Sequence, residues 1–175
     1  MVPHMALTRR QRLRRVGKVC CQYLQNHAYY RAGFRTTAPG RQGHFWNSVV
    51  NNSLDLCVLE FCKLFADRHG KHYWRKIVTN EAAFSIGMLV AVGMDETQFG
   101  EYIDTFKFYR DKYLAHLDEE TVGDFPHLGP GKKAVSYLYD YLLKHEDEGD
   151  FFLDASATAA DFYADRAEEA AQVYE

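Results

Sequence analysis

The stretch Phe108-Tyr-Arg-Asp-Lys-Tyr-Leu-Ala-His-Leu-Asp118 carries the most informative pattern in the chain. Arg110 is followed directly by Asp111 and, six positions after the arginine, by His116. Apolar residues recur at spacings of three and four, which is typical of an amphipathic helix: Phe99, Tyr102, Ile103, Phe106, Tyr109, Tyr113 and Leu114. On a straight α-helix an offset of six leaves two side chains about 120° apart. We therefore expect the arginine and the histidine to flank one groove, late on a helix.

Helical periodicity extends over the chain on both sides of this stretch, and no alternating run is long enough to predict a strand. We expect helices at about 8–30, 45–69, 81–94, 96–116, 132–144 and 156–174, with a short helix or turn at 71–78. Thr8 and Asp95 are expected to cap the first helix and the motif helix. The predicted fold class is an all-α bundle of five or six helices. Because residues 81–94 carry few charges, that helix is expected to be the most buried.

The size and composition of the chain favour one globular domain. It has 175 residues, of which 47% are hydrophobic and 26% charged, as in ordinary globular proteins. We place a single domain at 5–175, interpret residues 1–4 as an artificial leader, and take 146–175 as an acidic extension with a peripheral helix.

No apolar run reaches the ~18–20 residues of a membrane span. The cysteines fit neither a zinc motif nor a disulfide framework, which indicates reduced thiols in a cytoplasmic protein: Cys20, Cys21, Cys57 and Cys62.

Charge is distributed unevenly although the net charge is only −3. Residues 1–54 contain nine Lys and Arg and no Asp or Glu, whereas residues 146–175 contain ten Asp and Glu and one Arg. This asymmetry indicates either a polyanionic partner or docking of the two ends on each other. A basic ridge of Arg10, Arg14 and Lys18 could hold nucleic-acid phosphates, and a solvated helix face explains it equally well. The acidic segment could also mask the basic helix from nucleic acid.

The motif at residues 110–118, Arg-Asp-Lys-Tyr-Leu-Ala-His-Leu-Asp, resembles the Arg-x(4–6)-His signature of the HEPN superfamily. It is most similar to the abortive-infection type, in which R-[ND]-K-x-x-A-H-x-D is familiar. The resemblance implies a small helical bundle, and in many members a metal-independent endoribonuclease of toxin–antitoxin or phage-defence systems. It also implies RNA as substrate, a homodimer that pairs two motif helices, and an antitoxin protein as a possible partner. No cofactor and no metal is implied.

The resemblance also assigns roles to individual residues. Arg110 and His116 would be catalytic, with Asp111 orienting the arginine or the nearby backbone. Candidate substrate contacts are Lys107, Lys112 and Tyr113 on the motif helix, and Asn47 or Asn51 on the helix beside it. One departure concerns control: toxins that are modified by a nucleotidyltransferase antitoxin carry a tyrosine two residues after the histidine. Here that position is Asp118, which puts adenylylation at this position in doubt.

An arginine and a histidine are suited to RNA cleavage, in which the 2′-hydroxyl attacks the adjacent phosphate. The imidazole can move protons because its ordinary pKa lies near neutrality. The guanidinium stays charged and can grip two phosphate oxygens as negative charge builds up. DNA lacks the 2′-hydroxyl, so this chemistry would be specific for RNA and would leave a 2′,3′-cyclic phosphate.

Other interpretations of the motif remain open. Arg110 is explained equally by a surface ion pair, since Asp111 could pair with it or with Lys107, and His116 by a favourable position at a helix end. The chain would then be a non-catalytic module that binds RNA or a protein, or that dimerises. A helical small-molecule or metal enzyme is a third class. For this class, His69 and His72 are three residues apart, but no Glu-x-x-His pattern accompanies them.

Overall fold

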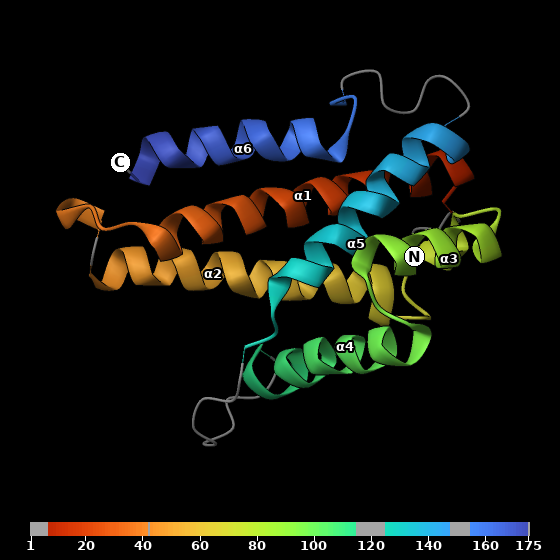
Figure 1. Cartoon of the computed structure of the whole chain (residues 1–175), viewed down its shortest axis with the longest axis horizontal. Coiled ribbons are helices and arrows are strands. Elements are labelled where there is room, and N and C mark those ends of the chain that lie inside the picture. Colours follow the sequence, from red (N-terminus) through yellow and green to blue (C-terminus); the bar gives the residue numbers. More distant parts are fainter. Residues whose placement is uncertain (1–6, 42, 115–124, 148–154, 175) are drawn as a thin grey trace, which may run out of the picture.

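The computed structural model describes residues 7–41, 43–114, 125–147 and 155–174, and these form helices joined by turns (Figure 1). The six α-helices are α1 (Arg9–Arg35), α2 (His44–Phe61), α3 (Glu81–Val92), α4 (Glu96–Tyr109), α5 (Leu128–Tyr141) and α6 (Ala159–Tyr174). Short 3₁₀ turns lie at Pro39–Arg41 and Trp74–Lys76. The described part of the chain contains no strand, so the predicted all-α bundle is confirmed. None of its helices is both long and apolar enough to cross a lipid bilayer.

Side-chain caps fix where the helices begin. Thr8 and Asp95 each form a capping box, in which the side chain accepts a backbone N–H three residues later and Gln11 or Gln98 reaches back. Both predicted caps are therefore confirmed. Asn80 caps α3, and Gly93 ends it in the left-handed conformation, with φ of 80°, which glycine adopts without steric cost.

Three helices continue past their α-helical part into one π-helical turn each. These turns are Cys62–Ala66 after α2, Arg110–Leu114 after α4 and Leu142–Glu146 after α5. A π-turn bonds residue i to i+5 and is wider than an α-turn, and it is a known way for a helix to end. Two of them, Cys62–Ala66 and Arg110–Leu114, bring the motif arginine to its partner, as described below.

The hydrophobic core centres on α1 and on an aromatic cluster beside it. α1 packs against α2, α5 and α6 (Figure 1). Phe61 of α2 is fully buried, and the centroid of its ring lies 4.1 Å from that of Phe106. Further rings surround it: Tyr23, Phe65, Phe99 and Tyr102. All four cysteines are unpaired, and burial raises the pKa of the Cys62 thiol to about 12, as expected of packed thiols.

The prediction that residues 81–94 form the most buried helix is wrong. α3 lies at the surface of the bundle and buries only Phe84, Met88 and Val92, which share one face. On its outer side Ile86 and Val90 are 67% and 77% exposed. A scarcity of charged residues does not bury a helix when neighbouring elements cover only one of its sides.

The start of α5 also differs from the prediction, which placed Gly129-Pro-Gly131 in a loop. The helix begins at Leu128 and includes these residues in its first turn. Proline is tolerated there because the first N–H groups of a helix need no intrahelical acceptor. Gly131 is required by packing, since a Cβ atom there would lie 2.5 Å from the Tyr23 hydroxyl and 2.9 Å from that of Tyr102.

The acidic C-terminal region docks on the basic N-terminal helix, which was one of the two explanations for the charge asymmetry. α6 lies along α1 and buries Ala159, Ala170 and Tyr174 (Figure 1). Glu146, whose side chain is 1% exposed, pairs with Arg9. Deleting residues 146–175 would expose part of the core as well as α1. A change in RNA binding after this deletion would therefore not by itself show that the acidic segment covers the basic helix.

His27 of α1 is expected to make the stability of the protein depend on pH. The ring is buried, and its Nδ1 lies 3.0 Å from the Tyr163 hydroxyl of α6. Burial, and then the positive charges of Lys132 and Arg31 and the nearby His127, lower its pKa from 6.5 to about 4. The unfolded chain binds this proton more readily than the folded one. The stabilising contribution is therefore complete above about pH 6.5 and is lost as the pH falls toward 4.

Urea unfolding at pH 7.5 and pH 4.5 measures this contribution. We expect wild type to lose on the order of 2 kcal/mol more than His27→Gln over this interval, because glutamine does not titrate. His44→Gln, at an exposed position, is the matched control and should behave as wild type. Equal losses in wild type and His27→Gln would show that the buried imidazole does not contribute.

Candidate functional site

Arg110 begins the π-helical turn that follows α4. The α-helix ends at Tyr109, and residues Arg110–Leu114 form the wider turn. The angle of about 120° expected between the arginine and His116 assumed a regular α-helix, so that estimate does not apply to this segment. His116 lies outside the described residues, as does Asp118. The geometry of the site is therefore built from Arg110 and its neighbours.

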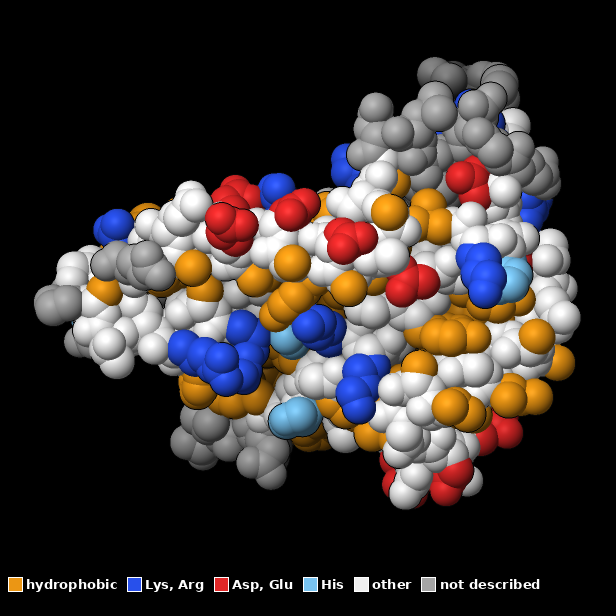
Figure 2. Space-filling view, turned by 45° about the horizontal axis from the view of Figure 1, so that its top comes forward, with side chains coloured by type: hydrophobic (Ala, Val, Ile, Leu, Met, Phe, Trp, Pro, Cys, Tyr) orange, Lys and Arg blue, Asp and Glu red, His pale blue; other side chains and the backbone are white. Residues whose placement is uncertain are grey.

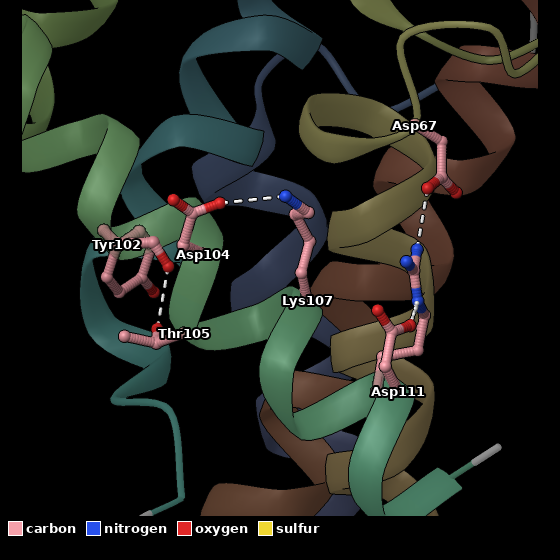
Figure 3. Close-up of polar contacts among 7 residues, drawn as sticks. Asp67, Tyr102, Asp104, Thr105, Lys107 and Asp111 are labelled. Atoms are coloured by element: carbon pink, nitrogen blue, oxygen red, sulfur yellow. Dashed lines mark hydrogen bonds and ion pairs between the residues drawn. The ribbon is translucent and has the colours of Figure 1, made fainter. Parts of the chain in front are cut away.

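Two carboxylates hold the guanidinium of Arg110. Its Nη1 donates to Oδ1 of Asp67 at 2.7 Å, and its Nε donates to Oδ1 of Asp111 at 2.8 Å (Figure 3). The first bond ties the turn after α4 to the residue that follows the π-turn of α2. The hydrogen bonds that the guanidinium donates to Asp111 and Asp67 raise its already high pKa. Arg110 is thus permanently charged and fixed in direction.

The fixed guanidinium retains donors for a ligand. The group has five N–H donors, of which two are used by Asp67 and Asp111. Its side chain is 24% exposed, and within the described part of the chain no other group accepts a bond from it. Nη2 and the second N–H of Nη1 can therefore bind an oxyanion, such as a phosphate, in the planar geometry of arginine.

A second contact joins α2 to the end of α4 one residue before the arginine. The Tyr109 hydroxyl donates to Oδ1 of Asp55 at 3.1 Å. Burial is the largest cause that raises the pKa of both groups. The Tyr109 ring also lies against Tyr113 and Phe125, with centroids 5.2 and 5.6 Å away. The base of Arg110 is thereby anchored in the bundle.

Asn47 and Asn51 lie on the same face of α2 as Asp55, two turns and one turn before it. α2 and α4 run in opposite directions (Figure 1). Both are exposed, and neither side chain has a hydrogen bond to the described motif residues. The polar residues that reach the motif from this part of the chain are instead Asp55 and Asp67. Neither residue was predicted from the sequence to have a role at the site.

The remaining predicted contacts differ in their surroundings. Lys107 pairs with Asp104 at 3.0 Å on the exposed side of α4 (Figure 3). Lys112 is half-buried, and the ring of Tyr113 packs between Phe108 and Tyr109. The structure therefore brings Arg110, Asp111 and Tyr113 into one region and points Lys107 into a separate ion pair.

The charges around Arg110 also fit a structural role. Asp67 and Asp111 are two carboxylates against one guanidinium, so the three groups together carry a net charge of −1. An ion pair of this kind, partly open to solvent, typically contributes less than about 1 kcal/mol. No group of three or more His, Cys, Asp or Glu in the described ranges could hold a metal ion.

The comparisons with known proteins add no relative. No model of a protein family matches the chain, and neither curated proteins nor solved structures give a match. The HEPN resemblance accordingly stays a prediction from the motif at 110–118.

Proposed function

We propose that the chain is a metal-independent endoribonuclease of the HEPN type, acting as a toxin or phage-defence effector in the cytoplasm. The observation that carries the proposal is the guanidinium of Arg110, which is held by Asp67 and Asp111, keeps N–H donors that neither carboxylate uses, and belongs to a side chain that is 24% exposed. The resemblance of the motif at 110–118 supports it. An orienting role for Asp111 agrees with its bond to Arg110 Nε.

The proposed reaction is an internal transfer of the phosphate. The imidazole of His116 takes the proton of the 2′-hydroxyl, whose oxygen forms a bond to phosphorus. The bond from phosphorus to the 5′-oxygen breaks, and that oxygen gains a proton from water or from His116 of the partner subunit. Arg110 stabilises the negative charge that builds up on the phosphate oxygens. The products are a 2′,3′-cyclic phosphate and a 5′-hydroxyl.

A homodimer is part of the proposal because two motif helices would then complete one cleft. Apolar side chains flank the contact between Tyr109 and Asp55: Phe108 on α4 is 55% exposed and Leu56 on α2 is 41% exposed. A second copy that packs against both side chains would remove their apolar surface from water, which favours association. A second copy that covers them would place the two arginines close to each other. An antitoxin protein that covers the same face would prevent this dimer and thereby inhibit the ribonuclease.

Matched RNA and DNA strands test the proposed reaction. With excess EDTA present, we expect wild type to cut a single-stranded RNA and to leave the DNA strand of the same sequence intact, because DNA lacks the 2′-hydroxyl. The RNA fragments should end in a 2′,3′-cyclic phosphate, which mass spectrometry distinguishes from a linear phosphate. Equal cutting of the DNA, or linear 3′-phosphate as the first product, would contradict the mechanism.

A non-catalytic module is the second candidate function. The observation that favours it is that two carboxylates already neutralise Arg110, as in a structural ion pair. Such a module would bind RNA or a partner protein and cut nothing. It predicts that Arg110→Gln lowers stability slightly and leaves RNA binding within about twofold of wild type.

A further inference from the structure

A cavity lies between α1, the start of α5 and α6, and Arg110 is not among its lining residues. Its volume is about 780 Å³, within the range of small-molecule sites. Figure 2 shows blue and pale blue side chains gathered on this face, below a row of red side chains. The residues with relevant chemistry are Tyr30, Arg31, Arg35, His127, Lys132 and Tyr163. The lining includes Phe125, whose ring packs on Tyr109 beside the candidate ribonuclease site, but none of the residues proposed to contact RNA there.

The lining of the cavity carries three cations and no carboxylate. Arg31 and Arg35 stand one turn apart on α1, and Lys132 reaches in from the start of α5. No Asp or Glu lines the cavity, and none of these three cations forms an ion pair within the described ranges. Burial and the charge of Arg31 lower the pKa of Lys132. Holding like charges together costs free energy, which a bound anion would offset.

Aromatic rings line the same cavity. Nζ of Lys132 lies 3.4 Å from the centroid of the Tyr163 ring, whose hydroxyl bonds to His27. Two more aromatic residues line the cavity: Tyr30 on α1, which stacks with Phe34, and Phe125, which packs on Tyr109 and is 55% exposed. Cations beside aromatic faces suit a ligand that joins a phosphate to a flat ring, because the rings accept stacking while the cations bind oxygen. Inorganic phosphate alone would leave most of this volume empty.

We propose that this cavity binds a nucleotide, with Arg31, Arg35 and Lys132 on the phosphate and Tyr30 and Phe125 against the base. The same chemistry is offered by a free mononucleotide and by one unit of an RNA strand. The site contains neither Arg110 nor any residue proposed to act in cleavage. Binding of a nucleotide here is therefore tested separately from the proposed ribonuclease.

Calorimetry and fluorescence anisotropy with the full chain test the proposal and separate the two sources. The probes are adenosine 5′-monophosphate, adenosine, inorganic phosphate and a fluorescein-labelled ten-nucleotide RNA. RNA affinity is measured with proteins that also carry Arg110→Ala, so that the RNA is not cut. We expect Arg31→Gln/Arg35→Gln to weaken binding of the monophosphate or of the RNA by about 10- to 100-fold. Lys132→Gln, which changes a residue on a different helix, should also weaken this binding.

The matched control is Arg68→Gln/Lys71→Gln, which removes two positive charges from exposed positions elsewhere and should leave affinity within about twofold. Circular dichroism confirms that each variant is folded. Loss of monophosphate binding in the variants identifies a free nucleotide as ligand, and loss of RNA binding alone identifies a strand. Unchanged affinity of the double variant, equal binding of adenosine or of inorganic phosphate, or no binding of either nucleotide probe by wild type would overturn the proposal.

Discussion

Replacing Arg110 with alanine is expected to lower the rate of RNA cleavage by about 100- to 1000-fold, the usual effect of removing a group that stabilises transition-state charge. The effect should fall on the chemical step, because the guanidinium is proposed to bind the phosphate most strongly as negative charge builds up. Single-turnover cleavage at saturating protein measures this step directly. Arg110→Lys should remain strongly impaired, since an ammonium keeps the charge but lacks the planar fork of donors.

The controls separate catalysis from stability, because Arg110 also ties the end of α4 to Asp67. Arg68→Ala removes a neighbouring exposed arginine and should cut RNA at the wild-type rate. Thermal unfolding of Arg110→Ala and Arg110→Lys should show losses below about 1 kcal/mol, as for other partly exposed pairs. If Arg110→Lys restored full activity, the guanidinium geometry would have no catalytic role.

Replacing Phe61 with alanine is expected to destabilise the protein by about 3–5 kcal/mol, the typical range for Phe→Ala in a core. The side chain is fully buried and its ring contacts those of α4 and of Phe65. Truncation removes these contacts and leaves a cavity that the surrounding rings fill only in part. Urea unfolding at neutral pH gives the free energy, and the same change should lower the melting temperature by roughly 10 °C.

Phe45→Ala is the matched control for the core prediction. Phe45 precedes Trp46 on α2 and is 70% exposed, so its truncation should cost less than about 0.5 kcal/mol. A loss for Phe61→Ala no larger than that of Phe45→Ala would mean that the aromatic cluster does not organise the bundle.

The helices could be predicted largely from local sequence because their signals are local. Apolar residues at spacings of three and four predicted each helix. The capping residues Thr8 and Asp95 predicted where α1 and α4 begin. The exposure of α3 could not be predicted in this way, since it depends on which neighbours cover a helix. The early start of α5 was missed because Gly129-Pro-Gly131 is typical of a loop, and only contact with Tyr23 and Tyr102 explains Gly131.

Only part of the candidate site could be predicted, because some of its contacts join residues that are far apart in the sequence. Asp111 follows Arg110 directly, so its contact with the arginine could be predicted from the motif. Asp67 is 43 positions from Arg110, and nothing in its local sequence distinguishes it from any polar residue near a helix end. The π-turns that bring the two together depend on backbone packing. The nucleotide cavity likewise combines α1, α5 and α6 residues that lie about a hundred positions apart.

Cleavage of RNA in excess EDTA by wild type, Arg110→Ala and His116→Ala tests the central claim most directly, once all three are shown to be folded and dimeric. We expect wild type to cut without metal and both variants to lose activity by about 100-fold or more. Loss in both would assign the reaction to the motif at 110–118. Equal cutting by all three proteins, or no cutting of varied RNAs by wild type, would contradict the proposed ribonuclease.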